Sequence, residues 1–367
     1  MLRTIDSGAT NKAAKALIEK INYLADEIDH SIALMEVCGT HTMAIGKSGI
    51  RKVLPPNVRL ISGPGCPVCV THDWEIDGFI NLAKREGVVI ATFGDLLKVP
   101  GPNGSLADAK TSGADVKIVY STLDALKLAR KQPNQEVVFL GVGFETTAPT
   151  VATSIIQAAE EGIENYSVLS MHKLVPPALR VLVEDPHTKV DGFICPGHVS
   201  TIIGVEPYEF ISDEYKKPCV IAGFEQIDIL QSIYMLLEQM SSGSSETQLQ
   251  YTRAVSQRGN STARMISDQV FETSTAWWRG IGPIENSGLA IKPEYKAYDA
   301  RIKFNLIEPE NKESYINKSC SCGDILKGHK LPPECQLFGK GCNPMKPLGP
   351  CMVSSEGACA AYYKYNL

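Results

Sequence analysis

Two thiols stand in the stretch Ile61-Ser62-Gly63-Pro64-Gly65-Cys66-Pro67-Val68-Cys69-Val70-Thr71. Gly63 and Gly65 tolerate backbone angles that other residues avoid, and Pro64 and Pro67 fix their own φ angles. A stiff loop that presents two sulfur atoms is poorly explained as core filling. The stretch therefore predicts that a buried strand ends here in a loop that carries chemistry.

A third thiol lies upstream, beside an imidazole, in Val37-Cys38-Gly39-Thr40-His41-Thr42. This segment also follows an apolar run. Loops at the carboxyl ends of parallel strands line a common crevice. We therefore expect the Cys38 loop and the Cys66–Cys69 loop to converge on one site.

The chain outside these loops alternates short apolar runs with helical segments, which is typical of doubly wound parallel sheets. Eight runs are many for one sheet, so we predict two α/β lobes with a break near Pro133. The eight runs are 32–37, 58–61, 88–92, 116–120, 137–140, 167–171, 191–194 and 219–222.

The pattern changes after Glu225. An apolar helix is predicted over 227–240, followed by a polar linker and by helical segments to about Phe271. From Thr273 onward the strand and helix signals fade, while cysteine, proline and glycine increase. The predicted domains are a first lobe (1–133), a second lobe (134–235) and a helical and cysteine-rich iron–sulfur domain (236–367).

The composition is that of an ordinary globular protein, with 367 residues, 44% hydrophobic residues and a net charge of −5. This charge argues against a broad basic surface for nucleic acid. No apolar run reaches membrane-spanning length, and the first twelve residues lack the apolar core of a signal peptide. We therefore expect a cytoplasmic location without nucleic-acid or membrane partners, where eleven cysteines indicate metal or redox chemistry.

Six of the eleven cysteines lie from Cys320 onward. Thiolates are the ligands of iron–sulfur clusters and of structural zinc. A segment with so little apolar pattern needs a disulfide or a bound metal to fold. The paired Cys-x-x-Cys knuckles of many zinc sites are absent here. An iron–sulfur cluster is the favoured interpretation, with zinc, disulfides or free thiols as alternatives, for Cys320, Cys322, Cys335, Cys342, Cys351 and Cys359.

The Cys66–Cys69 pair has three interpretations: half of a structural zinc site, a thiol–disulfide redox pair, or, with Cys38, a soft-metal site open to exchange. His41 alone is more often a hydrogen-bonded loop histidine than a metal ligand or a base. Two nucleotide-binding motifs fail. Gly46-Lys47-Ser48 lacks the glycine five residues upstream, where His41 stands, and Gly141-x-Gly143 lacks a third glycine.

Other polar residues also follow predicted strands. Each is either functional or simply a helix cap or a buried hydrogen-bonding group: Glu145, His172 and His198. Cys195 and Cys219 fall within apolar runs, and we interpret them as inert core side chains.

Taken together, these segments resemble the HypD family of [NiFe]-hydrogenase maturation factors from about residue 32 to the C-terminus. The motifs that carry the resemblance are Glu36-Val-Cys-Gly-Thr-His41, Gly63-Pro-Gly-Cys-Pro-Val-Cys69, Thr92-Phe-Gly-Asp95, Gly143-Phe-Glu-Thr-Thr147, Pro196-Gly-His-Val-Ser-Thr-Ile-Ile-Gly204, Ala222-Gly-Phe-Glu225, and a tail that runs from Cys322-Gly-Asp-Ile-Leu to Met352-Val-Ser-Ser-Glu-Gly-Ala-Cys359.

The resemblance implies a scaffold for assembly of the Fe(CN)2CO group of hydrogenase. Such a scaffold works with a small HypC-type chaperone and accepts cyanide through a HypE-type donor. Mononuclear iron would be held by Cys38, Cys66 and Cys69, with His41 beside them. A [4Fe-4S] cluster would be held by Cys322, Cys335, Cys342 and Cys359. Cys320 and Cys351 lie outside this pattern, as spare thiols or redox partners.

Two other classes of function remain open from the residues. One is an iron–sulfur thiol–disulfide oxidoreductase without mononuclear iron. The other is a hydrolase or transferase that uses His41, His198 and Glu145, with zinc stapling the tail. Metal content separates them: iron in excess of sulfide indicates the scaffold, matched iron and sulfide the oxidoreductase, and zinc alone the third class.

Overall fold

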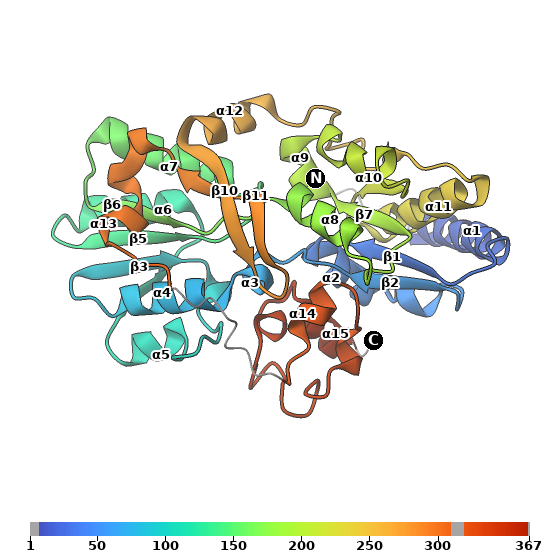
Figure 1. The fold of residues 1–367 in the computed structure, drawn as a ribbon, viewed down its shortest axis with the longest axis horizontal. Coiled ribbons are helices and arrows are strands. Elements are labelled where there is room, and N and C mark those ends of the chain that lie inside the picture. Colours follow the sequence, from blue (N-terminus) through green and yellow to red (C-terminus); the bar gives the residue numbers. More distant parts are fainter. Residues whose placement is uncertain (1–6, 310–318, 366–367) are drawn as a thin grey trace.

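A computed structural model describes residues 7–309 and 319–365 (Figure 1). All eight predicted runs are strands, and they form two parallel sheets, as expected for an α/β fold. The first sheet has the order β2-β1-β7-β8-β9 and the second the order β4-β3-β5-β6. The strands are β1 (Ile32–Glu36), β2 (Val58–Ser62), β3 (Val88–Thr92), β4 (Asp115–Ile118), β5 (Glu136–Gly141), β6 (Tyr166–Ser170), β7 (Gly192–Pro196), β8 (Cys219–Ala222) and β9 (Thr247–Leu249).

Each sheet reverses its strand order once. In the first sheet β1 has β2 on one side and β7 on the other, so that Leu34 lies opposite both Leu60 and Gly192. In the second sheet β3 lies between β4 and β5. In open parallel sheets, ligands bind at the carboxyl ends of the strands beside such a reversal. The topology therefore marks two positions for a site, one after β1 and β7 and one after β3 and β5.

The strands do not divide between the sheets where the sequence predicted. Pro133 falls between β3 and β5, which are hydrogen-bonded neighbours in the second sheet. β7 and β8, predicted in the second lobe, lie in the first sheet, and β9, predicted in the third domain, extends that sheet. Apolar runs indicate which residues are buried but not which strands pair. The sequence therefore does not show that the chain returns to the first sheet at β7.

Helices cover both faces of each sheet, which explains the near-continuous apolar strands. One face of the first sheet packs on α1 and α11, and one face of the second on α6 and α7. The helices are α1 (Ser7–Asp26), α2 (Gly39–Ser48), α3 (Pro67–Val70), α4 (Asp73–Ala83), α5 (Leu106–Thr111), α6 (Thr122–Lys131), α7 (Ala148–Glu161), α8 (Val175–Glu184), α9 (Gly197–Ile203), α10 (Glu209–Asp213), α11 (Gln226–Ser242), α12 (Ser261–Val270), α13 (Ala300–Lys303), α14 (Cys322–Leu326) and α15 (Ala358–Tyr365).

Short 3₁₀ helices fill several connections: η1 (Ile50–Lys52), η2 (Gly94–Leu96), η3 (Glu206–Tyr208), η4 (Pro293–Tyr298), η5 (Pro332–Glu334) and η6 (Pro350–Met352). The central apolar core includes buried side chains from both sheets and from the cysteine-rich C-terminal segment. The two lobes and this segment therefore share one core.

The expectation that strand signals fade after Thr273 is wrong. β10 (Phe271–Trp278) and β11 (Gly282–Ile291) form a long antiparallel hairpin between the lobes (Figure 1). Its residues alternate irregularly between buried and exposed, and its pairing shifts between Ser274 and Ala276. Such a shift breaks the period-2 pattern by which a strand is recognised. The prediction of little regular structure holds better for residues 319–365, which we call the tail domain and which lie below the junction of the lobes in Figure 1.

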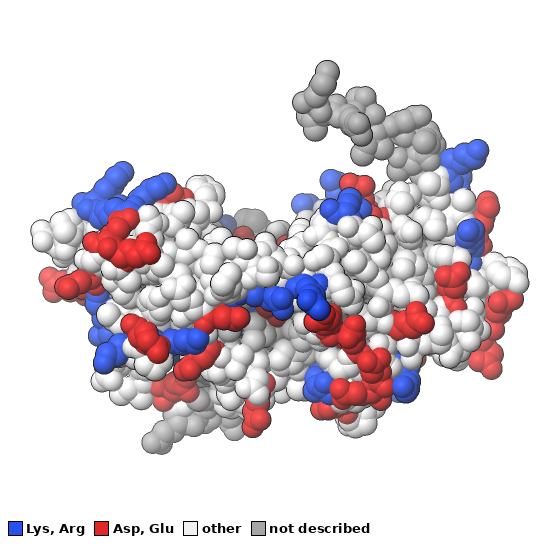
Figure 2. All heavy atoms as spheres, turned by 90° about the horizontal axis from the view of Figure 1, so that it is seen from above, with Lys and Arg blue, Asp and Glu red and all other residues white. Residues whose placement is uncertain are grey.

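Acidic and basic side chains are intermixed on the face drawn in Figure 2, in keeping with the small net charge. Within residues 7–309 and 319–365, no helix has both the length and the apolar character needed to cross a membrane.

Candidate functional site

The carboxyl ends of the two sheets meet at one pocket of about 240 Å³. We call each parallel sheet with the helices packed on it a lobe, numbered as the sheets are. Cys38 follows β1, Gly65 follows β2, and His198 follows β7, all from the first lobe. The second lobe contributes the loops after β3 and β5, and the tail domain contributes Glu356. Both positions that the topology marked therefore open into the same space, and the loops carrying Cys38 and Cys66 converge there.

Cys38 is the N-cap residue of α2, and its side chain is buried. Burial, together with the nearby carboxylate of Glu356, raises the pKa of the Cys38 thiol to about 11. The thiol is therefore protonated at neutral pH and has to lose its proton before it can bind a metal ion as a thiolate.

A close backbone approach joins the two cysteine loops. The backbone N–H of Gly39 donates to the carbonyl oxygen of Gly65 over 2.8 Å. A Cβ atom at Gly65 would lie 2.5 Å from the Cα atom of Cys38, which is closer than non-bonded atoms approach. The backbone of Cys38 thus packs directly against residue 65, which precedes Cys66, and this close approach requires a glycine there.

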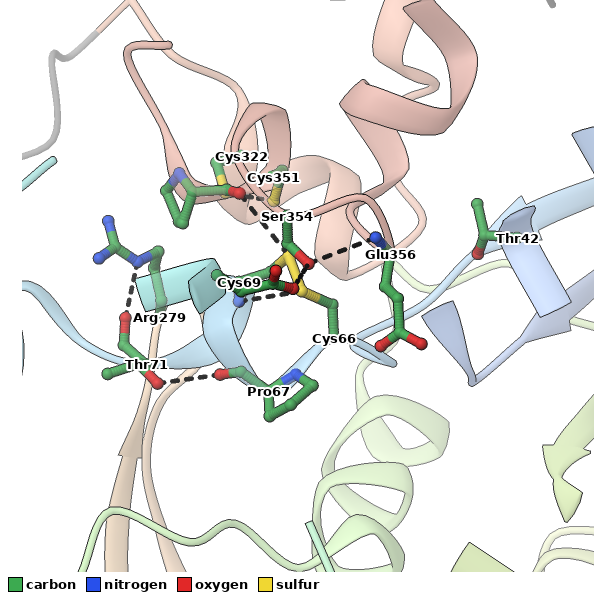
Figure 3. The surroundings of a disulfide bond; sticks show 12 residues. Thr42, Cys66, Pro67, Cys69, Thr71, Arg279, Cys322, Cys351, Ser354 and Glu356 are labelled. Carbon is green, nitrogen blue, oxygen red and sulfur yellow. Dashed lines mark hydrogen bonds between the residues drawn. A yellow bond between two sulfur atoms is a disulfide. The ribbon is translucent and has the colours of Figure 1, made fainter. Parts of the chain in front are cut away.

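Cys66 and Cys69 form a disulfide across the short helix α3, with their Cα atoms 5.2 Å apart (Figure 3). The two cysteines are thus close enough to oxidise together, as the interpretation of a thiol–disulfide pair requires. The backbone N–H of Cys69 also donates to the Sγ atom of Cys66 over 3.2 Å. Both residues are buried, so the pair is shielded from solvent in this state.

Two histidines from the predicted sites lie on opposite faces of the Phe224 ring. His41 is fully buried, and its Nε2 atom lies 2.9 Å from the carbonyl oxygen of Gly223. Its ring stacks on that of Phe224, with the ring centroids 4.6 Å apart. Burial lowers the pKa of His41 to about 4. His198 stacks on the other face at 3.8 Å, and its side chain is exposed in the pocket. The imidazole that reaches the pocket is thus that of His198, and His41 lies behind it.

Glu145 and His172 do not join this pocket. His172 lies by a separate cavity of about 380 Å³, beside the buried Lys173–Glu75 ion pair, and burial lowers its pKa to about 3. Glu145 is buried, and its Oε1 atom accepts a hydrogen bond from the backbone N–H of Val175 over 2.8 Å. Both side chains fit the structural interpretation left open by the sequence.

The buried carboxyl of Glu145 makes stability depend on pH. Burial raises its pKa from 4.5 to about 7. Between these values the unfolded chain is ionised while the folded protein keeps the proton, so stability falls as pH rises through this window and is constant above it. At about 1.4 kcal/mol per pKa unit, the loss is about 3 kcal/mol.

We expect Glu145→Gln to remove this contribution. Denaturant unfolding of both proteins at pH 4 and pH 8 should show the variant gaining about 3 kcal/mol over the wild type at the higher pH. An equal difference between the two proteins at both pH values would contradict the shift.

The six cysteines of the tail domain surround one small cavity. They come from segments with little regular structure, namely α14, η6, α15 and the turns between them. The Sγ atoms of Cys322 and Cys351 lie 3.0 Å apart, and the hydrogen bond from Cys351 lowers the pKa of Cys322. Burial raises the pKa of Cys320 to about 12. In the described parts of the chain, no three His, Cys, Asp or Glu side chains are grouped as the ligands of one metal ion.

Cys195 and Cys219 are fully buried in neighbouring strands, with their Sγ atoms 3.0 Å apart. Their predicted place in the core is confirmed.

The tail domain reaches both lobes beside the pocket, which the sequence did not indicate (Figure 3). The Sγ atom of Cys69 lies 3.9 Å from the carbonyl oxygen of Pro350, next to Cys351. The Ser354 hydroxyl donates to Asp95 of the second lobe over 3.3 Å, and the Thr40 hydroxyl of the first lobe donates to Glu356 over 2.8 Å. Glu356 lies more than 300 positions from Cys38 in sequence. No local signal places its carboxylate in the pocket.

These features define a class of protein. Two parallel-sheet lobes present cysteine loops to a shared pocket, and a cysteine-rich domain closes against that pocket from the end of the chain. The family model described as "HypD: Hydrogenase formation hypA family" matches residues 12–366. The chain belongs to the HypD family.

Curated relatives support this membership over nearly the full length. The chain is 47% identical over 359 residues to the hydrogenase maturation factor HypD of Rhodobacter capsulatus, covering 96% of this chain and 95% of the relative. It is 44% identical over 351 residues to HypD of Escherichia coli K12, covering 95% and 93%. A putative hydrogenase expression/formation protein of Methanocaldococcus jannaschii is 45% identical over 352 residues, covering 96% and 97%.

Proposed function

We propose that this protein acts in hydrogenase maturation as a scaffold on which the Fe(CN)2CO group is assembled. Its relatives are named as hydrogenase maturation factors. The observation that carries the finer proposal is the convergence of Cys38 and the Cys66–Cys69 loop at one pocket between the lobes. Thiolates are strong donors that suit electron-rich iron bound to cyanide and carbon monoxide.

An assembly site also has to release its product. Cys38 lines the pocket from one loop, and Gly65 and Pro67, which flank Cys66, line it from the other. Reduction of the disulfide would free Cys66 and Cys69 beside it as further thiols. Two or three sulfur ligands leave coordination positions free for cyanide, carbon monoxide and a ligand from a partner. In this proposal a HypC-type chaperone shares the iron at the pocket, and a HypE-type protein delivers the cyanide.

We propose that the tail domain holds a [4Fe-4S] cluster as its resident cofactor. Its donor set is six thiols around one cavity, in a segment with few regular elements of its own. Cys322, Cys335, Cys342 and Cys359 would hold the cluster, which would supply one-electron redox chemistry beside the pocket. The contact between Cys69 and Pro350 places the Cys66–Cys69 disulfide against this domain.

Protein purified without oxygen, together with its small chaperone partner, tests the proposal. We expect iron in excess of sulfide, and infrared bands of bound cyanide and carbon monoxide. Cys38→Ala should lower retained iron at least about tenfold, equivalent to about 1.4 kcal/mol, and change partner affinity far less. Iron is measured by elemental analysis and affinity by calorimetry.

Cys219→Ala is the matched control, because this thiol is buried in the first sheet and does not line the pocket. If Cys38→Ala abolished partner binding while the bound fraction kept its iron, Cys38 would be a docking residue and not an iron ligand.

A second candidate function is a thiol–disulfide oxidoreductase in which the tail cluster passes two electrons, one at a time from an external reductant, to the Cys66–Cys69 disulfide, which takes up two protons to become two thiols. The disulfide and its contact with the tail domain favour it. In that case iron and sulfide would be matched, and the diatomic infrared bands would be absent from the wild type.

A further inference from the structure

His198 occupies a distinct position at the pocket. It lies at the start of α9, directly after β7, at the point where the first sheet reverses its strand order. Its ring stacks on Phe224, and the edge of Phe224 meets Tyr251 at 5.8 Å. These contacts fix the plane of an imidazole whose remaining surface is exposed to the pocket.

The ring nitrogens of His198 are free to bind a ligand. The hydroxyl of Thr201 donates a hydrogen bond to the backbone carbonyl oxygen of His198. Within residues 7–309 and 319–365, the ring nitrogens of His198 make no hydrogen bond. His41 differs, because its Nε2 atom is engaged with Gly223 and its ring is closed off from solvent.

Two neighbouring hydroxyls at the pocket already donate their hydrogens to other groups. The hydroxyl of Thr40 donates to Glu356, and that of Thr147 donates to the carbonyl oxygen of Phe144. Asp95 and Glu356 carry carboxylates, which accept hydrogen bonds when ionised. His198 therefore offers the pocket an N–H group whose hydrogen is not already used.

The proposed cargo needs such a donor. An iron-bound cyanide keeps a lone pair and negative charge on its nitrogen atom, which makes it a strong acceptor, and hydrogen bonds to charged acceptors are the stronger ones. The oxygen atom of bound carbon monoxide is a weak acceptor. A single fixed donor can therefore distinguish the two ligands by position.

We propose that a ring N–H of His198 donates a hydrogen bond to the nitrogen of an iron-bound cyanide, and so determines which coordination position cyanide occupies. The inference rests on the proposed scaffold function and assigns a specificity residue to the same pocket. Burial lowers the pKa of His198 and the carboxylate of Glu356 opposes this shift only in part, so the donor is the single ring N–H of the neutral imidazole.

Infrared spectroscopy of the anaerobic complex with its chaperone partner tests the assignment. His198→Phe keeps a flat ring against Phe224 but removes the N–H, whereas His198→Gln restores an N–H donor. We expect one cyanide band to shift to lower wavenumber in His198→Phe, by more than the carbon monoxide band, and to return toward its wild-type position in His198→Gln. His30→Phe, at an exposed site with a side chain 59% accessible, is the matched control and should leave all bands unchanged.

The outcomes separate this inference from the function on which it rests. Wild-type bands of cyanide and carbon monoxide that stay in place in His198→Phe would overturn the role of His198 and leave the scaffold standing. An equal shift of both kinds of band, without recovery in His198→Gln, would show a general packing effect and also overturn it. A wild-type complex without these bands would overturn both proposals.

Discussion

Replacing Gly65 by alanine is expected to separate the two cysteine loops and to abolish tight retention of iron. The added Cβ atom would lie 2.5 Å from both the Cα and the N atom of Cys38, and 2.6 Å from the carbonyl carbon of Val37. All three are backbone atoms, so no side chain can rotate away to make room. Forcing extra volume into a packed site costs about 1–3 kcal/mol.

The structural consequence falls on the site itself. The hydrogen bond from Gly39 to the carbonyl oxygen of Gly65 holds the loops together, and Gly65 directly precedes Cys66. Moving this segment away from Cys38 moves two proposed iron ligands apart. We therefore expect retained iron to fall at least about tenfold, or about 1.4 kcal/mol, along with the loss in stability.

Gly78→Ala provides a matched control. Gly78 lies inside α4, and a Cβ atom there would meet nothing within 4 Å. Because glycine is a poor helix former, this change should stabilise the protein by about 0.5–1 kcal/mol and leave iron retention unchanged. Denaturant unfolding and elemental analysis of both variants decide the matter. Equal stability and equal iron in the two variants would show that the close approach is not needed.

The contrast between these two glycines illustrates what the sequence could and could not predict. The turn chemistry around Gly63 and Gly65 correctly indicated the end of a strand, and apolar runs located all eight predicted strands. Both signals are local, because they depend on backbone freedom and on burial of neighbouring residues. That Gly65 presses against Cys38 is a tertiary fact, and a glycine required for close approach looks in sequence like any turn glycine.

The same limit applies to the imidazoles. His41 and His198 both follow strands of the first sheet, and the family resemblance placed His41 beside the iron-site thiols. The structure places Phe224 between the two rings, and only one of the rings faces the pocket. Which face of a loop is exposed depends on the segment that packs behind it, here the residues after β8, and no periodicity in either motif reports that contact.

Strand order was unpredictable for a related reason. The chain leaves the first sheet after β2, builds the whole second sheet, and returns at β7. Central runs such as β3 and β7 are equally apolar because these strands are buried on both faces. The apolar pattern therefore located eight of the parallel strands but missed β9, whose residues are only half-buried, and it divided the strands in the wrong places.

Loss of the tail cluster is expected to have the second large effect. In residues 319–365 the helices are short, at five residues for α14 and eight for α15, and five of the six cysteines are buried at the centre of the domain. We expect a segment with so few regular elements to depend on metal binding to offset the entropy of ordering its chain. Wild-type protein purified without oxygen should be brown, and Cys342→Ser should be bleached.

The effect should extend to the pocket, because the tail domain holds both lobes there through Ser354–Asp95 and Glu356–Thr40. Without the cluster, we expect the tail domain to become sensitive to protease while the two lobes resist it, and Cys38 to react faster with a thiol reagent as Glu356 withdraws. Cys219→Ala, which removes a cysteine from the first sheet, is the control. This variant should stay brown, its tail domain should resist protease, and its Cys38 should react slowly with the thiol reagent. A colourless wild type with one tightly held zinc ion would refute the cluster. A bleached Cys342→Ser protein whose tail stayed protected would instead show that packing against the lobes alone orders the domain.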